Sequence, residues 1–454
     1  MAPFLTTVLL VPKKPKSEND CIVMSRQLFE HFQLKKDQEI DVLLGKKSIN
    51  MIVQMVEIAP TEIILSENIF NHLSLPIQPY KLQANFNQDN QTLQLGPIIG
   101  LLTDFSSNEE GVPHFRSVHM FCEELHQGIK EKGGFFFVFA YNQFPNKGYC
   151  LDNGDWVITE PPLPDVIYNR IHSRRLEQTS LFKRFHTLLD ELNIPIFNDR
   201  FLSKWEVHER LLQKSQQPSF LPETRIFSRE NLTEFAKRFE TVFIKPINGS
   251  QGRNIYKLNK KKDNSYTYQS SFQSKSDYNE KPCTLDEIYQ QINHGLKNRI
   301  YIIQQGIPLV THNGGVMDFR VLCHKNLQNH WDVTSVVARI SAEQEFVSNI
   351  ARGGRIMKPL NALTACMSKT KAMEVLALMK ELSIETASII SQFSSGITGE
   401  LGIDIGVDLS GKPWLIEVNS KPSKSFEDGQ VKIRPSAKAI IQYCTLLAFD
   451  TVIK

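Results

Sequence analysis

Side chains near the carboxyl end of the chain have the types and spacing of a metal site. In KPWLIEVNSKPSKS, residues 412–425, an apolar strand ends in Glu417 and Asn419, which share strand parity and leave from one face. A Ser-Gly-Lys turn before it predicts a hairpin with ELGIDIGVDL, which brings Asp404 beside Glu417. Asp408 falls beside the turn, and we interpret it as a solvated carboxylate. Two carboxylates and an amide oxygen are hard donors, so the hairpin predicts a Mg²⁺ (or Mn²⁺) site shared with substrate phosphates.

A lysine and a short glycine loop farther upstream have the types of a phosphate site. Lys245 ends the predicted strand TVFIK, shortly before a loop of Gly249, Ser250, Gln251 and Gly252. The loop is not a P-loop, because no Gly-Lys-Ser/Thr sequence and no helix follow it. A strand lysine beside such a hairpin can instead act as a point charge on a triphosphate.

The apolar strand YIIQQGIPL, residues 301–309, stops at Gly306 and Pro308. An interrupted strand exposes backbone N–H and C=O groups, and these can pair with an adenine edge. Taken alone, the pattern fits the end of an edge strand equally well. The sequence shows no Ser-His-Asp or Cys-His pattern that would indicate a covalent nucleophile.

The first hundred residues contain an internal repeat. IVMSRQLFEHFQL (22–34) and IILSENIFNHLSL (63–75) align without a gap at an offset of 41. Each predicts a short strand, a serine N-cap (Ser25 or Ser66) and a helical turn, and each precedes two alternating strands. Two strand–helix–strand–strand halves predict a small duplicated β-barrel over residues 1–95, resembling double-psi barrels. With no nucleophile or metal cluster in it, we interpret this barrel as a recognition or assembly module.

From residue 97 onward, predicted strands and helices alternate, which indicates a parallel α/β sheet. We expect this sheet to form a domain over 96–199. The predicted strands are PIIGLLTDF, 134–141, 165–171 and IPIF, and the predicted helices are 115–131 and 182–192. A helix from Lys204 leads to a second α/β unit, which begins with the strand ETRIF. We assign it to a domain over 200–430, with lobes over 200–300 and 301–430, followed by a C-terminal helix within 431–454.

Composition argues against several classes of protein. The net charge of +3 is too mild to indicate a nucleic-acid partner. No apolar stretch approaches the ~20 residues of a membrane span, and the first residues are not typical of a signal peptide. The seven cysteines are scattered, odd in number and never in Cys-x-x-Cys spacing. This pattern indicates a reducing cytosol without a zinc cluster or a disulfide framework.

Together, and in this order, these motifs resemble the ATP-grasp superfamily over about 97–426. The resemblance is strongest to RimK-like amino-acid ligases and, around the metal hairpin, to D-alanine–D-alanine ligases. SNIARGG matches the family's N-x-x-R-G-G segment, which carries Asn349 and Arg352. The chain is also similar to the YheC/YheD group of Bacillus endospore coat-associated proteins.

The resemblance implies an α/β (α+β) multi-domain fold, with a pre-grasp α/β domain and a two-lobed ATP-grasp domain after the N-terminal duplicated β-barrel. It implies an ADP-forming carboxylate–amine ligase that makes an amide or peptide bond through an acylphosphate and needs no covalent enzyme nucleophile. The implied partners are ATP, Mg²⁺, a small-molecule or peptide carboxylate, an amine, and spore coat proteins. The implied location is the cytoplasm of the mother cell of a sporulating bacterium, in association with the coat. The alternative is a coat-assembly protein that binds nucleotide without turnover.

The family's site residues carry over by position. Arg352 and Arg320 are implied to be catalytic, and Asp404, Glu417 and Asn419 to bind metal. Nucleotide binding is implied for Lys204, Lys245, Gly249, Ser250, Gln251, Gly252, Gln304, Gln305, Gly306, Ile307, Asp318 and Asn349. The chain departs from the D-alanine ligases at Gly402, where those enzymes carry an arginine. The substrate arginine is therefore expected elsewhere, and the options are Arg320, Arg339 and Arg352.

Overall fold

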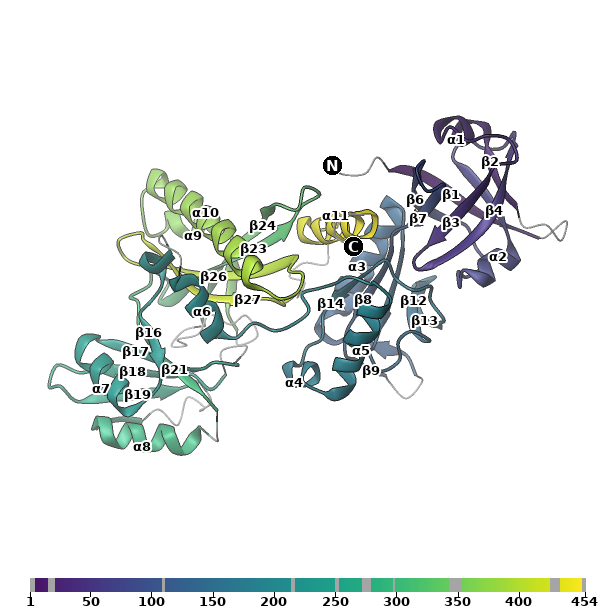
Figure 1. The fold of residues 1–454 in the computed structure, drawn as a ribbon. Coiled ribbons are helices and arrows are strands. Elements are labelled where there is room, and N and C mark those ends of the chain that lie inside the picture. The colour runs from purple at the N-terminus through teal and green to yellow at the C-terminus, as the bar shows by residue number, and fades with distance from the viewer. Residues whose placement is uncertain are drawn as a thin grey trace.

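The computed structural model describes residues 5–14, 21–107, 111–213, 217–249, 253–271, 279–296, 299–342, 353–424 and 433–450. A closed barrel, three six-stranded sheets and a two-stranded ribbon make up its β-structure (Figure 1). Within this described part, no helix is long and apolar enough to cross a membrane.

The N-terminal repeat folds as the predicted duplicated barrel. Its strands lie in the closed order β1-β5-β2-β4-β3-β7-β6, and β1 also pairs with β6. Ser25 and Ser66 cap the two short helices, accepting from Leu28 N at 3.2 Å and Ile69 N at 3.3 Å. The sequence interpretation missed β1, which precedes the repeat. The elements are β1 (Thr6–Lys13), β2 (Cys21–Ser25), α1 (Arg26–His31), β3 (Glu39–Leu44), β4 (Lys47–Val56), β5 (Glu62–Ser66), α2 (Glu67–His72), β6 (Tyr80–Asn87) and β7 (Thr92–Gly96).

The second sheet has the order β13-β12-β11-β8-β14-β15. Strands β11, β8, β14 and β15 are parallel, as predicted. The antiparallel β12–β13 hairpin was not predicted, although its turn residues Asn153 and Gly154, both with positive φ, are a hairpin signal. The elements are β8 (Ile98–Leu102), β9 (Ser106–Ser107), β10 (Pro113–His114), η1 (Arg116–Val118), α3 (His119–Lys132), β11 (Phe135–Phe139), β12 (Gly148–Asp152), β13 (Asp155–Thr159), β14 (Val166–Asn169), α4 (Arg174–Glu177), α5 (Ser180–Glu191) and β15 (Ile196–Phe197).

Helices cover both faces of this sheet. Phe182 and Phe185 of α5 share one core with Phe137 and Phe139, and that core continues into the barrel. On the other face, α3 and the C-terminal helix α11 (Pro435–Phe449) pack together (Figure 1). The chain's last described helix therefore packs on a sheet formed by residues more than 230 positions earlier, which fixes the second sheet against the rest of the molecule.

The third sheet is antiparallel, in the order β16-β21-β17-β18-β19-β20. Helices α7 and α8 cover it through Leu232, Phe235, Ile288 and Ile292. The β17–β18 pair is the strand–loop–strand predicted around the glycine loop. The elements are α6 (Lys204–Leu212), η2 (Gln217–Phe220), β16 (Thr224–Ile226), α7 (Arg229–Arg238), β17 (Thr241–Pro246), β18 (Tyr256–Lys260), β19 (Tyr266–Ser270), β20 (Asn279–Cys283), α8 (Leu285–Gly295) and β21 (Tyr301–Gln305).

The fourth sheet has the order β25-β24-β23-β26-β27, and its sixth strand, β22, pairs with β23 beside this path. The long helix α10 packs on it. Its last two strands are the hairpin predicted to carry the metal site. The elements are β22 (Thr311–His312), β23 (Gly315–Lys325), β24 (Trp331–Ile340), β25 (Arg355–Met357), α9 (Pro359–Thr364), α10 (Lys369–Phe393), β26 (Glu400–Val407) and β27 (Pro413–Asn419).

Candidate active site

Asp404 and Glu417 lie directly opposite each other in the β26–β27 pair, as the sequence predicted. Asn419 follows on the same strand, and its Nδ2 donates to Asp404 Oδ2 at 3.4 Å. The hairpin therefore brings the two carboxylates and the amide together, and their role as metal ligands stays a prediction.

Asp408 lies beside the turn, as predicted, but it is not simply solvated. Its Oδ1 accepts hydrogen bonds from Ser410 N at 2.9 Å and from Lys412 N at 3.0 Å. Its Oδ2 accepts one from Trp414 Nε1 at 2.8 Å. Partial burial raises the pKa of this carboxyl, but the hydrogen bonds outweigh burial and lower it overall. Asp408 is therefore the residue that organises the turn.

Two arginines hold Asp404. Arg320 lies opposite Asp404 in the β23–β26 pair, and its guanidinium binds both carboxylate oxygens, with Nη2 at 2.9 Å from Oδ2. Arg339 Nη2 lies 3.1 Å from the same Oδ2 and also forms a bidentate pair with Asp318. Burial alone would raise the pKa of Asp404, but the two arginines lower it below its ordinary value. The predicted nucleotide residue Asp318 is thus held by Arg339 in this arrangement.

Gly402 explains how Arg320 reaches this place. A Cβ atom at Gly402 would lie 2.6 Å from Pro422 Cβ and 3.3 Å from Arg320 Cδ. The absence of a side chain therefore leaves room for an arginine from the neighbouring strand. The expectation that one of Arg320, Arg339 and Arg352 serves as the substrate arginine stays a prediction.

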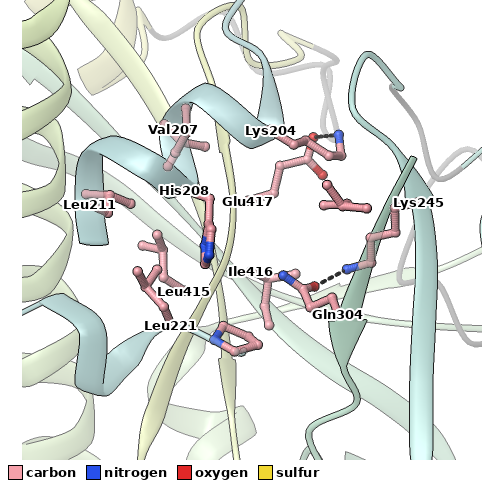
Figure 2. Close-up of a pocket in the computed structure, with 13 residues that line it drawn as sticks. Lys204, Val207, His208, Leu211, Leu221, Lys245, Gln304, Leu415, Ile416 and Glu417 are labelled. Carbon is pink, nitrogen blue, oxygen red and sulfur yellow. Dashed lines mark hydrogen bonds and ion pairs between the residues drawn. The ribbon is translucent and has the colours of Figure 1, made fainter. Parts of the chain in front are cut away.

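Lysines from two elements approach Glu417 from different sides. Lys204, the first residue of α6, donates from Nζ to Glu417 Oε1 at 2.7 Å (Figure 2). It also donates to the Gly249 carbonyl at 2.8 Å. Lys245 on β17 donates from Nζ to Gln304 Oε1 at 2.7 Å. Burial lowers the pKa of Lys245 to about 8, although Glu417 and Asp404 oppose that shift. A polyphosphate placed between the two lysines would meet a positive charge from each side.

The predicted adenine hinge is more internally bonded than the sequence suggested. Strand β21 lies between β16 and β17, so the edge-strand interpretation is wrong. Gln305 N donates to the Glu223 carbonyl at 2.8 Å, and Gly306 N donates to the Thr241 carbonyl at 2.9 Å. These two N–H groups are therefore not available to a base here. The nucleotide roles of Gln304, Gln305, Gly306 and Ile307 stay predictions.

Gln304 has a fixed orientation. Its Oε1 accepts from Lys245, and its Nε2 donates to Thr224 Oγ1 at 3.0 Å. A substitution at Gln304 would therefore change the placement of the phosphate lysine as well as the wall of the pocket.

A small cavity lies between these groups (Figure 2). Its volume of about 40 Å³ is room for about three waters. The lining residues are Lys204, Val207, His208, Leu211, Leu221, Pro222, Lys245, Ile302, Gln304, Leu415, Ile416, Glu417 and Val418. This mix of aliphatic wall and charged rim is typical of a nucleotide pocket.

His208 is a lining residue that the sequence interpretation missed. It lies four residues after Lys204 on α6, so the two side chains share one helix face, and this spacing was the available signal. Burial lowers the pKa of His208, which keeps its ring neutral near pH 7.

The side chains present fit a hard divalent cation in type. Carboxylate and amide oxygens are the ligands that Mg²⁺ takes in proteins, usually together with phosphate oxygens. Among the described residues, no group of three or more His, Cys, Asp and Glu side chains is placed to hold a metal alone. The set therefore suits a cation that arrives with a nucleotide, whose phosphates supply the further oxygens.

Five predicted site residues lie outside the described residues. They are Ser250, Gln251 and Gly252 of the glycine loop, and Asn349 and Arg352 of the SNIARGG segment. Their assigned roles stay predictions.

A buried ionic cluster near the site was also missed. Glu400 on β26 is fully buried and accepts hydrogen bonds from His324 Nε2 at 2.9 Å and Tyr168 OH at 2.5 Å. Arg170 Nη1 lies 3.3 Å from Glu400, and Lys424 Nζ binds it from the segment after β27. Burial alone would raise the pKa of Glu400, but Lys424 and His324 lower it strongly. The cluster fixes the metal hairpin to β14 of the second sheet.

Comparisons with known proteins agree with this architecture. A family model described as YheC/D like ATP-grasp matches residues 193–447, which include β15, the third and fourth sheets and most of α11. The endospore coat-associated protein YheD of Bacillus subtilis (strain 168) is 29% identical over 412 residues, covering 88% of each chain. YheC of the same organism, also an endospore coat-associated protein, is 23% identical over 304 residues, covering 66% of this chain and 80% of its own. A D-alanine–D-alanine ligase structure from Coxiella burnetii is 11% identical, with a TM-score of 0.46, covering 78% of this chain and 94% of its own.

Proposed function

This chain belongs to the YheC/D-like ATP-grasp family, and from that premise we propose that it is an ATP-dependent carboxylate–amine ligase. The observation that carries the proposal is the convergence of Lys204, Lys245 and Glu417 on one cavity, from three separate elements. Charged groups gathered in this way cost desolvation, and a bound polyphosphate with its cation would offset that cost.

The lysines hold the phosphates. Lys204 exchanges its partner Glu417 for phosphate oxygen, and Lys245 exchanges Gln304. Glu417 and Asn419, with Asp404, would then hold Mg²⁺, which when bound neutralises charge on the phosphate oxygens. The exchange keeps each buried ammonium hydrogen-bonded before and after binding, and it gives Lys245 an anionic partner in place of the neutral Gln304 amide.

Arg320 and Arg339 serve the acyl side of the reaction. A substrate carboxylate takes the γ-phosphoryl group of ATP, giving an acylphosphate and ADP, and an amine then displaces phosphate to form the amide. Arg320, poised beside Asp404, presents a planar guanidinium that suits carboxylate and phosphoryl oxygens. The chain's contribution is to orient the reacting groups and neutralise charge as it develops.

A second candidate is a coat-assembly protein that binds nucleotide without turnover. The names of its relatives YheD and YheC, both endospore coat-associated proteins, favour it. On either account we place the chain in the mother-cell cytoplasm of a sporulating bacterium, in association with the coat and its proteins.

Nucleotide titration and turnover separate the two candidates. The ligase predicts that ATP binds in calorimetry more tightly with Mg²⁺ than without it, and that Lys204→Ala weakens this binding. It also predicts ADP formation when carboxylate and amine substrates are supplied. Binding without ADP formation from any substrate pool supports the assembly protein, and no binding in either condition contradicts both.

A further inference from the structure

The second sheet has a topological switch point at β8 and β14. These strands are parallel neighbours, and their carboxyl ends lie side by side. The chain leaves β8 through α3 to β11 on one side and leaves β14 through α5 to β15 on the other. In open α/β sheets, ligands bind in the crevice at such a point. Asp104 follows β8 here, and His172 follows β14.

An aspartate, a histidine and a serine form a hydrogen-bonded chain at this point. Asp104 Oδ1 accepts the backbone N–H of His172 at 2.6 Å and lies 3.3 Å from His172 Nδ1. His172 Nε2 lies 3.0 Å from Ser117 Oγ. The three residues come from separate segments, so no sequence pattern could show the arrangement.

The neighbours of His172 fix its tautomer. Thr103 Oγ1 lies 3.3 Å from His172 Nδ1 and donates its own hydrogen to the Arg170 carbonyl at 3.2 Å, so it can only accept from the ring. The Asp104 carboxylate also accepts. Burial alone would raise the pKa of Asp104, but His172 and Arg116 lower it, which keeps the carboxylate ionised. Nδ1 therefore carries the proton, and Nε2 presents its lone pair to the Ser117 hydroxyl.

The backbone before Ser117 is held in an unfavourable conformation. Arg116 has a φ of 51°, whereas the other non-glycine residues with positive φ in the described ranges are Asn, Asp, Gln or Ser. Its backbone N–H donates to His114 Nδ1 at 3.2 Å, and its Nη1 lies 3.1 Å from Asp104 Oδ2. Such strain persists where surrounding contacts fix it, and it concentrates at functional sites.

We propose that Ser117 is a nucleophile, activated by His172 and Asp104, that accepts an acyl group from an ester. The Ser117 oxygen bonds to the acyl carbon while His172 Nε2 takes the hydroxyl proton. The bond between the acyl carbon and the ester oxygen then breaks, and the departing alcohol takes the proton from His172. A water molecule repeats the sequence, which releases the acid and restores Ser117. This activity uses no ATP and is independent of the ligase site.

Asp104 and Thr103 are positioning residues in this account, because each touches His172 and neither reaches the serine hydroxyl in the contacts above. Their effect is to hold Nδ1–H and to orient the ring. Ser117 itself is exposed, so its hydroxyl is open to a ligand from solvent.

Covalent labelling of the full chain with a fluorophosphonate probe tests the proposal. We expect one probe on Ser117, located by peptide mass spectrometry, and no probe on the peptide that contains position 117 in the Ser117→Ala variant. Removing the base with His172→Gln should slow labelling about 100-fold or more, and Asp104→Asn should also slow it. Ser107→Ala is the matched control, because Ser107 is another exposed serine, and Ser117 in this variant should be labelled at the wild-type rate.

Labelling of the wild-type protein alone can overturn the proposal, so the test does not depend on whether the variants fold. A probe that leaves Ser117 unlabelled, or that labels only other serines, contradicts it. Equal labelling rates in the wild type and a folded His172→Gln variant contradict the role of the histidine. Because the assay contains no ATP, its failure would leave the ligase proposal unaffected.

Discussion

Arg320 Nη2 lies 2.9 Å from Asp404 Oδ2 across the β23–β26 pair, and Glu417 lies on the other side of Asp404 in the β26–β27 pair. Asp404 is thus between a guanidinium and a second carboxylate. A cation entering this site would share Asp404 with Arg320 and Arg339, so a transferred phosphoryl group that engages the arginines would free carboxylate oxygens for metal. Binding of the cation and of the phosphates should therefore be coupled.

Substitutions of Asp404 and Asp408, which lie on one hairpin, should have different effects: the first on ligand binding and the second on stability. Asp404→Asn should weaken Mg-ATP binding and lower any turnover about 100-fold, because it removes the charge between Arg320 and Glu417. Asp408→Asn should leave affinity within a few-fold but cost about 1–3 kcal/mol of stability, since it disrupts bonds that form the turn. Calorimetry and thermal unfolding of both variants check this, and identical behaviour would refute the assigned roles.

Lys245 should make ATP binding sensitive to alkaline pH. Its pKa, lowered by burial to about 8, means that the ammonium is charged below pH 8 and neutral above it. If ATP binds only the charged form, affinity should be constant at neutral pH and fall about tenfold per pH unit above 8. Calorimetry across this range provides the measurement.

Lys245→Arg is the control for that titration. A guanidinium stays charged throughout the range, so its affinity profile should be flat. Burial also lowers the pKa of Lys421 and of Lys424 to about 8. An unchanged fall in affinity in Lys245→Arg would assign the effect to one of those lysines instead.

Glu400 should be essential for stability. Glu400→Gln leaves Lys424 and Arg170 buried without their carboxylate, and we expect a loss of about 3–5 kcal/mol at neutral pH. The folded-state pKa of Glu400 is lowered, so its contribution is fully present above the unfolded value of about 4.3 and declines as pH falls. The difference between wild type and variant should therefore shrink on acidification.

Glu57→Gln is the matched control, because Glu57 pairs with Arg26 on the surface and is 74% exposed. Its denaturation midpoint should equal that of the wild type. Equal midpoints for Glu400→Gln and Glu57→Gln would show that the buried cluster does not hold the hairpin.

Arg352 should act on the transferred phosphoryl group more than on nucleotide affinity. Charge develops at that group only during reaction, so Arg352→Lys should leave ATP affinity within a few-fold and lower ADP release about 100-fold. Comparing calorimetry with ADP release separates the two effects. A parallel loss of affinity would make Arg352 a nucleotide anchor, and unchanged release would make it a structural residue.

The features of the fold and of the site that the sequence predicted are formed by residues close together in the chain. Asp404 met Glu417 as expected, because one turn fixes the register between two adjacent strands. Ser25 and Ser66 were predicted as N-caps because each directly precedes its helix and caps a backbone N–H only three residues later. The β12–β13 hairpin was local too, and its Asn-Gly turn was overlooked.

The parts that the sequence could not predict depend on how the sheets pair. Arg320 and Asp404 are 84 residues apart, and only the antiparallel placement of β23 beside β26 brings them together. Glu400 meets Arg170 across 230 residues, through packing of the second sheet against the fourth. The hydrophobic periodicity of a strand does not specify which other strand or sheet lies beside it. Contacts such as these therefore follow from the topology of the sheets.

The most direct test of the ligase is the product. Purified protein, Mg-ATP and a pool of amino acids and peptides should yield ADP, phosphate and a new species whose mass is the sum of two pool members minus water. Glu417→Gln should abolish that product, whereas Glu374→Gln, an exposed change on α10, should not. Bound but intact ATP with no condensed product, in a protein shown to be folded, would contradict the account and leave a nucleotide-binding assembly protein.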